Sequence, residues 1–277
     1  MFSRKTFTSP TARLSYLEWN EGQKPLLLLH GMADHALVWS SLGDYLQKDY
    51  HIIAPDLRGH GESDKPKTGY KFRDYIEDLE ALMDFLGWEK ASILGHSWSA
   101  KLAAIWAGEN PRRFDRMILV DPFFIGKMPS LIRLTFPILY EVLPFLKITR
   151  SFSSYEEIEN TARQLKQYRG WSEFQEKVFK ESIEQKNDGT WSGKFYRDAR
   201  EEIFEDVMAV AGFTGSIDIP TLLITPEKGL NRTEWQIKPY KTYVKNLQIQ
   251  TVPGNHWPFL VEPGAFDRAI EEFLKAG

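Results

Sequence analysis

The chain has 277 residues, enough for one large domain or for one domain that carries an insertion. Its hydrophobic content of 42% and charged content of 26% are typical of a folded globular protein and exclude a disordered chain. Thirty-five basic and 38 acidic residues give a net charge of -3, so we expect no nucleic-acid partner. Without cysteine, the chain has no disulfide, no thiolate metal site and no cysteine nucleophile.

Two segments bear on the location of the protein. Arg4 and Lys5 stand near the start, but no apolar run follows them, so no secretory signal is expected. The most apolar stretch, residues 131–148, contains charged residues and is interrupted by Pro137 and Pro144, which argues against a bilayer-spanning helix. We therefore expect a cytoplasmic protein without a membrane span, and the oligomeric state stays open.

Short apolar runs alternate with helical patterns at both ends of the sequence. One helical pattern covers residues 75–86, with apolar side chains three and four positions apart, and Gly87 follows it as a left-handed cap. The apolar runs lack polar alternation, as is typical of strands buried on both faces of a mostly parallel sheet covered by helices. The predicted strands are residues 25–29, 52–54, 92–94, 117–120, 221–224 and 247–250.

The alternation stops after Asp121 and resumes near residue 219. Helical patterns dominate between these points, at residues 155–168, 171–184 and 198–210. We predict that residues 1–121 and 214–277 form one core and that residues 122–213 form an inserted helical cap. The large apolar side chains of residues 131–146 belong either to the core of this cap or to a substrate pocket, and we expect Phe136 and Phe145 to contact substrate.

The five residues Gly95-His96-Ser97-Trp98-Ser99 carry the clearest chemical signal. They lie between a strand pattern and a helical pattern, so Ser97 is expected on a sharp turn that exposes its hydroxyl above the sheet. Such a turn strains the backbone, and the small residues Gly95 and Ser99 avoid clashes beside it. A glycine turn with an incidental serine is the alternative. We predict that Ser97 is a nucleophile.

Two further segments contain groups that a serine nucleophile needs. Gly31 lets the chain turn outward, so the amide of Met32 can join that of Trp98 in binding an oxyanion, while His30 is expected to be structural. His256 follows the last strand pattern, where a histidine is well placed as a general base. A lone loop histidine is normally solvated or structural, but its position after the serine, with an acid between them, favours catalysis.

With these motifs the chain resembles the α/β-hydrolases of the capped, cofactor-free kind, from about residue 14 to residue 273. Residues 54–64 are similar to the family's loop after its fourth strand, and we assign no chemistry to that loop. The resemblance implies a mostly parallel eight-stranded sheet flanked by helices, an inserted helical cap, and no cofactor. No metal is expected, since the six histidines show no close ligand pair and cysteine is absent.

The sequence departs from the family at the triad acid. After the strand at residues 221–224 the family typically reads Gly-Glu-x-Asp, but here Gly229 occupies the place of the aspartate. Asp121 ends the preceding predicted strand, a position from which some relatives, such as certain haloalkane dehalogenases, supply the acid. Glu227 is the alternative. We favour Asp121 because the acid must lie at the carboxyl edge of a strand near the histidine. A second departure, Ser99 in place of the usual glycine, keeps a small residue.

We therefore expect a serine hydrolase that cleaves a carboxylic ester of a neutral or lipophilic small molecule through Ser97, His256 and Asp121. Its partners would be this acyl substrate and water. A serine at the nucleophile position argues against the dehalogenase and epoxide-hydrolase branches, where the resemblance implies an aspartate. Cleavage of a carbon–carbon bond, a lactone or a thioester stays open, as does a ligand-binding protein with weak residual hydrolysis.

Overall fold

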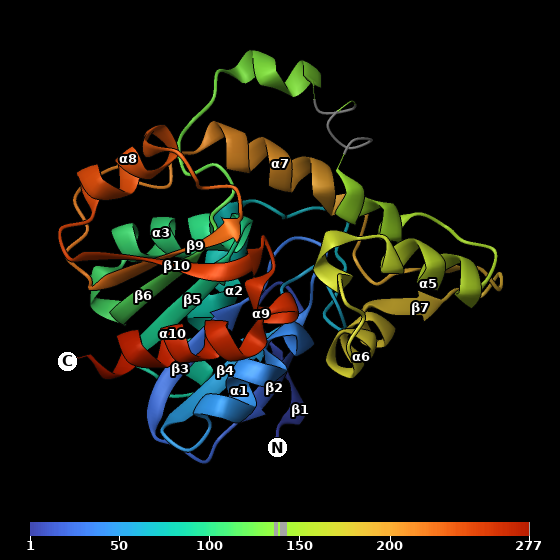
Figure 1. Cartoon of the computed structure of the whole chain (residues 1–277), viewed down its shortest axis with the longest axis horizontal. Helices are drawn as coiled ribbons and strands as arrows, with labels where there is room; N and C mark the ends of the chain where they lie inside the picture. Colours follow the sequence, from blue (N-terminus) through green and yellow to red (C-terminus); the bar gives the residue numbers. More distant parts are fainter. Residues whose placement is uncertain (136–137, 139–142, 277) are drawn as a thin grey trace.

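An eight-stranded sheet forms the centre of the protein, in the order β1-β2-β4-β3-β5-β6-β9-β10 (Figure 1). The structure is a computed structural model and describes residues 1–135, 138 and 143–276. All neighbouring strands from β4 to β10 are parallel, and β2 runs antiparallel to both of its neighbours. The strands are β1 (Ser3–Thr8), β2 (Arg13–Trp19), β3 (Lys24–Leu29), β4 (Tyr50–Pro55), β5 (Ala91–His96), β6 (Phe114–Val120), β9 (Thr221–Lys228) and β10 (Leu247–Asn255).

This sheet confirms the predicted fold class. Each predicted strand lies within an observed one, and the hairpin of β1 and β2 adds the two strands that the apolar runs did not indicate. The residues of β1 are almost all exposed, so β1 contains no apolar run by which to recognise it. The antiparallel pairing of β1 with β2 attaches this exposed strand to the edge of the sheet.

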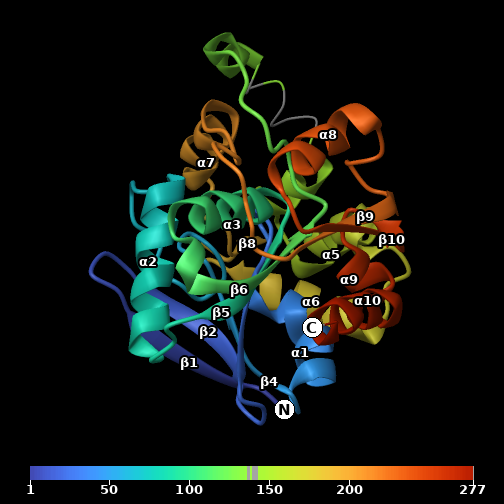
Figure 2. The ribbon, with the colours of Figure 1, turned by 90° about the vertical axis from the view of Figure 1, so that its left-hand side faces the viewer.

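Apolar side chains of the central strands point alternately to the two faces of the sheet and are buried on both. In β3, Leu27 and Leu29 belong to one hydrophobic cluster, whereas Leu26 and Leu28 belong to the other. Figure 2 shows α2 (Phe72–Phe85) and α3 (Trp98–Glu109) on one side of the sheet, and α1 (Ser40–Leu46) and α10 (Pro263–Lys275) on the other. This two-sided burial explains why the strands read as continuous apolar runs.

The predicted helices correspond to observed ones with small shifts at their ends. Helix α2 begins three residues earlier than the pattern at 75–86, and Gly87 after it has a φ of 70°. The other helical elements outside the insertion are η1 (Ala36–Trp39), η2 (Pro111–Arg113), α8 (Glu234–Tyr243) and α9 (Pro258–Val261). Among the helices that the structure describes, none is long and apolar enough to cross a membrane.

Residues 122–213 lie between β6 and β9, and those of them that the structure describes contribute no strand to the eight-stranded sheet. The predicted helical patterns appear there as α5 (Tyr155–Arg163), α6 (Glu173–Ser182) and α7 (Ala199–Ala209). A two-stranded sheet was not predicted, because β7 (Ile183–Gln185) and β8 (Trp191–Gly193) have only three residues each. The remaining elements are η3 (Ser130–Thr135), η4 (Pro144–Thr149) and η5 (Lys166–Tyr168). In Figure 1, α5 and α6 lie beside the main sheet and α7 lies above it.

The buried side chain of Lys101 ties both ends of this insertion to helix α3. Its Nζ donates hydrogen bonds to the carbonyl oxygens of Phe124 at 3.1 Å and Gly126 at 2.6 Å, where the insertion begins. It also donates to the carbonyl oxygen of Val207 at 2.5 Å, near the end of α7. Because α3 starts next to Ser97, the insertion is held directly against the helix that follows the predicted nucleophile.

Candidate active site

Ser97 lies on a tight turn between β5 and α3. Its φ of 58° and ψ of -118° place a residue with a side chain in a region that is normally left to glycine. The turn brings neighbouring backbone very close, since a Cβ at Gly95 would lie 2.4 Å from the carbonyl oxygen of Ser99. The small residue predicted at position 95 is therefore a steric requirement of this turn.

Ser99, which replaces the glycine usual in the family, has a place in the same turn. Its hydroxyl accepts a hydrogen bond from the backbone N–H of His96 at 3.0 Å. The same Oγ lies 3.0 Å from the carbonyl oxygens of Leu29 and His96, to either of which it can donate. Ser99 thereby links the turn at Ser97 to the end of β3, where the predicted oxyanion loop begins.

Ser97, His256 and Asp121 form a continuous hydrogen-bonded chain. His256 Nε2 is 3.0 Å from Ser97 Oγ, and His256 Nδ1 is 2.6 Å from Asp121 Oδ2. These residues come from the ends of β5, β10 and β6, which the parallel sheet brings to one edge. With Nδ1 donating to the carboxylate, the lone pair of Nε2 faces the serine hydroxyl, as a general base requires.

Asp121 is fully buried, and it is held by donors from the segment that follows β9. The backbone N–H of Leu230 lies 2.8 Å from Oδ2, and the backbone N–H and side-chain amide of Asn231 donate to Oδ1 at 3.1 and 3.0 Å. Burial by itself raises the pKa of this carboxyl, but the contacts with His256, Asn231 and Leu230 outweigh it and lower the pKa below its ordinary value. Asp121 is therefore ionised at neutral pH, so its carboxylate is an anionic partner for His256.

Glu227, the alternative acid, is exposed near the end of β9 and lines a different pocket from Ser97. Gly229, which stands in the place of the family's aspartate, lies directly against Asp121. The sequence contained no signal for the role of Asn231, because its contact with Asp121 joins positions 110 residues apart.

Met32 and Trp98, whose backbone amides are proposed for oxyanion binding, line the same cavity as Ser97. Trp98 is the first residue of α3, so its N–H has no partner within the helix. Neither this N–H nor that of Met32 donates to another backbone group in the described part of the chain. His30 is structural, as predicted: Nδ1 donates to the carbonyl oxygen of Gly31 at 2.7 Å, and Nε2 accepts from Leu57 N–H at 3.0 Å.

A second histidine, His96, supports the loop that carries His256. Its Nε2 donates to the backbone carbonyl oxygen of His256 at 2.8 Å. Its Nδ1 lies 3.6 Å from Asp34 Oδ2, which also accepts a hydrogen bond from Trp257 Nε1 at 3.2 Å. Burial lowers the pKa of His96, so the ring is a neutral donor at neutral pH. His96 was part of the serine motif in the sequence, but its contact with His256 depends on the tertiary fold.

Ser97 and His256 open into a cavity of about 320 Å³, within the range of small-ligand sites. Met32, Trp98 and Phe145 also line it. Phe145 packs edge-to-face on Trp257 with ring centroids 6.0 Å apart, while Phe136 lies outside the described residues. The other apolar side chains of the described residues around the cavity are Phe123, Leu143, Pro144, Phe204, Leu230 and Trp257.

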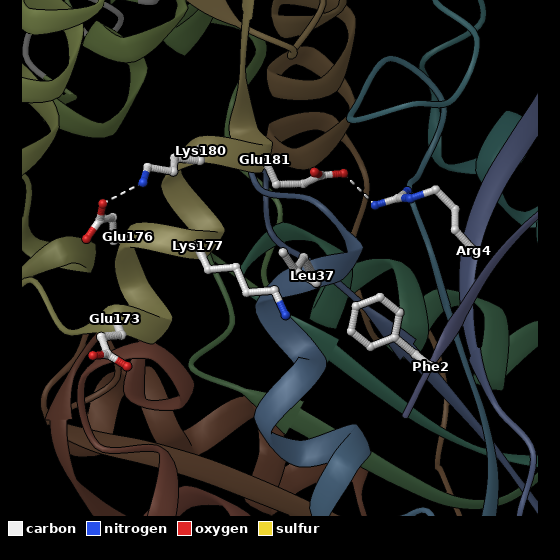
Figure 3. A pocket seen from close by; sticks show the side chains of 8 residues that line it. All are labelled: Phe2, Arg4, Leu37, Glu173, Glu176, Lys177, Lys180 and Glu181. Atoms are coloured by element: carbon white, nitrogen blue, oxygen red, sulfur yellow. Dashed lines mark hydrogen bonds and ion pairs between the residues drawn. The ribbon is translucent and has the colours of Figure 1, made fainter.

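A larger cavity of about 590 Å³ lies between the N-terminal residues and α6 (Figure 3). Four of its charged side chains form two ion pairs: Arg4 is 2.6 Å from Glu181, and Lys180 is 2.6 Å from Glu176. It contains no serine or histidine, so we place the candidate active site at Ser97. No cluster of three or more potential metal ligands occurs among the residues that the structure describes.

The sequence model of a family described as the alpha/beta hydrolase fold matches residues 24–263. Soluble epoxide hydrolase of Corynebacterium sp. (strain C12) is 34% identical over 128 residues, 46% of this chain and 43% of that protein, so the match spans less than half of the relative. Epoxide hydrolase 4 of Mus musculus is 26% identical over 283 aligned positions, covering 95% of this chain and 76% of that protein. The crystal structure of E-2-(acetamidomethylene)succinate hydrolase has a TM-score of 0.81 at 20% identity over 100% of both chains, which shows a shared fold.

Proposed function

Because this chain belongs to the α/β-hydrolase fold family, we propose that it is a serine hydrolase that cleaves carboxylic esters by way of an acyl-enzyme. The hydrogen-bonded chain from Ser97 through His256 to Asp121 is the single observation that carries this proposal. The mostly apolar wall of the cavity supports an acyl group with an apolar body.

In the first half of the reaction, Ser97 Oγ attacks the acyl carbon while its proton passes to His256 Nε2. The carbonyl oxygen of the substrate becomes an oxyanion and accepts hydrogen bonds from the amides of Met32 and Trp98. His256 then gives its proton to the alkoxide oxygen as the C–O bond breaks, and the alcohol leaves. Asp121 stabilises the imidazolium that exists between these two proton transfers.

In the second half, water attacks the acyl carbon and gives a proton to His256 Nε2. The tetrahedral intermediate uses the same two amides. It collapses as His256 returns the proton to Ser97 Oγ, and the carboxylic acid leaves. We also propose that residues 122–213 act as a cap over this reaction, since Phe145 and Phe204 of this segment line the cavity.

The names of two relatives raise epoxide hydrolysis as a second candidate. In that branch the family resemblance implies an aspartate nucleophile, and this chain has Ser97 in its place. We therefore favour acyl transfer over epoxide opening. Hydrolysis of thioesters, lactones or carbon–carbon bonds would use the same groups.

Labelling with a fluorophosphonate probe tests the nucleophile, and a series of p-nitrophenyl esters of increasing acyl length tests the reaction. We expect labelling at Ser97, and a loss of ester hydrolysis of about a thousandfold or more in both Ser97→Ala and His256→Ala. Circular dichroism would verify that both variants are folded. A folded protein that neither labels nor hydrolyses any ester would instead be a ligand-binding protein.

A further inference from the structure

Positively charged residues line the solvent-exposed part of the cavity beside Ser97, which we call its mouth. Lys166, Lys228 and Arg232 line this cavity, and all three are exposed. They come from three separate places: η5 of the insertion, the end of β9, and the segment before α8. Among the residues that the structure describes, no aspartate or glutamate lines the cavity. This local excess of positive charge stands against a net charge of -3 for the whole chain.

These three cations also have no side-chain partner among the described residues. In the described part of the chain, none of their side chains forms an ion pair or donates a hydrogen bond. Their hydrogen bonds there are made by backbone groups; for example, the Lys166 carbonyl oxygen accepts from Asn255 Nδ2 at 2.8 Å, and Arg232 N–H donates to Gln236 Oε1 at 3.1 Å. In the cavity of Figure 3, by contrast, the cations Lys180 and Arg4 both form ion pairs with glutamate side chains.

We propose that the substrate of this site carries a carboxylate, positioned at the cavity mouth while the scissile ester reaches Ser97. This inference rests on the proposed function and defines its substrate class as half-esters and other ester-carboxylates with a short apolar spacer. The apolar wall accommodates the spacer, and the guanidinium of Arg232 supplies the planar pair of donors that matches a carboxylate. This proposal differs from the expectation of a neutral or lipophilic substrate, because it adds an anionic end to the apolar body.

Exposed charges at a cavity mouth act mainly on the encounter with the ligand and on its orientation. Each exposed cation contributes little by itself, so we expect its loss to lower selectivity for an anionic ester about threefold. Loss of all three would then lower it about thirtyfold if their effects multiply. Salt should weaken the same preference, because ions screen exposed charges within about 10 Å at 0.1 M.

The first test measures kcat/KM for matched esters in a pH-stat. Monomethyl adipate and 5-acetoxypentanoate carry the carboxylate on the acyl and the alcohol side, and methyl hexanoate and pentyl acetate are their neutral counterparts. We expect at least one anionic ester to be preferred, and the preference to fall in Lys166→Gln, Lys228→Gln, Arg232→Gln and the triple variant. Lys67→Gln removes the same charge from an exposed site outside the cavity and should keep the preference.

The second test measures ligand binding without turnover, by calorimetry on Ser97→Ala. The preferred anionic ester should bind more tightly than its neutral partner, and this difference should shrink with added salt and in the triple variant. Equal affinities in Ser97→Ala, or an anionic preference that survives the triple substitution, would overturn the inference even if the enzyme hydrolyses neutral esters. Anion-selective binding without any hydrolysis or probe labelling would uphold the cationic site and reject the serine-hydrolase proposal.

Discussion

Gly229 lies directly against the carboxylate of Asp121. A Cβ at position 229 would stand 2.7 Å from Asp121 Oδ2 and 2.9 Å from Oδ1, closer than side chains pack. The family places its acid at position 229, and in this chain the absence of a side chain there leaves room for the carboxylate of Asp121. The next two residues, Leu230 and Asn231, donate hydrogen bonds to that carboxylate. The segment in which the family typically carries its acid thus supports the carboxylate that we propose in that role.

Gly229→Ala is expected to lower kcat/KM for ester hydrolysis about tenfold to a hundredfold, because the new methyl group displaces Asp121 from His256. Gly215→Ala is the matched control, since a Cβ there meets no atom within 4 Å. Both variants would be compared by ester assay and by melting temperature. An additional double variant, Asp121→Gly with Gly229→Asp, should recover part of the activity that Asp121→Gly loses. Full activity in Gly229→Ala would contradict the steric argument.

Asp121→Asn should reduce kcat on the order of a thousandfold while preserving the fold, because the asparagine amide presents the wrong hydrogen-bonding pattern to His256. Glu227→Gln should have little effect, since Glu227 is exposed and does not contact the histidine. Single-turnover kinetics with a p-nitrophenyl ester would give the acylation rate of each variant. The opposite ranking would transfer the role of the acid to Glu227.

Phe145→Ala should change the acyl-length preference more than the thermal stability. Phe145 lines the catalytic cavity and is only partly buried, so its removal mainly enlarges the space beside Trp257. Rates across the p-nitrophenyl ester series and a melting curve would be measured together. Phe179→Ala, which removes a fully buried ring of the insertion, is the contrasting control and should lower the melting temperature strongly. An unchanged length preference in Phe145→Ala would remove this residue from the substrate site.

The stability of the protein should depend on pH through Asp267 of α10. Burial raises the pKa of this carboxyl to about 7, although Ser41 Oγ donates a hydrogen bond to it at 2.7 Å. The folded state therefore holds the proton more tightly than the unfolded state. Its contribution to stability is fully present below about pH 4 and is lost as the pH rises through about 7.

Asp267→Asn cannot ionise, so it should stabilise the protein at pH 8 relative to wild type, by roughly 2–4 kcal/mol more than at pH 4. Urea unfolding at the two pH values would measure this difference in the free energy of unfolding. Asp84→Asn, at a position with 71% side-chain exposure, should show a much smaller pH-dependent difference. Parallel pH dependence in wild type and Asp267→Asn would show that Asp267 is already ionised in the fold.

Features that depend on near neighbours along the chain were predictable. The continuous apolar runs indicated strands buried on two faces, and both clusters of the core confirm this. The small residues around Ser97 indicated the sharp turn, which the φ of 58° at Ser97 confirms. Short-range sterics and side-chain periodicity act within a few residues, so the sequence of such a segment is sufficient to predict its conformation.

Features that join segments far apart in the sequence could not be predicted without the tertiary structure. The sequence left two acids open for His256, and it contained no sign that Asn231 would hold Asp121 or that His96 would support the loop of His256. The cations at the cavity mouth come from positions as far apart as Lys166 and Arg232. Their meeting depends on the order of the strands and on the path of the segments that follow them. Hydrogen bonds and charges act over a few ångströms in space, whatever the separation along the chain.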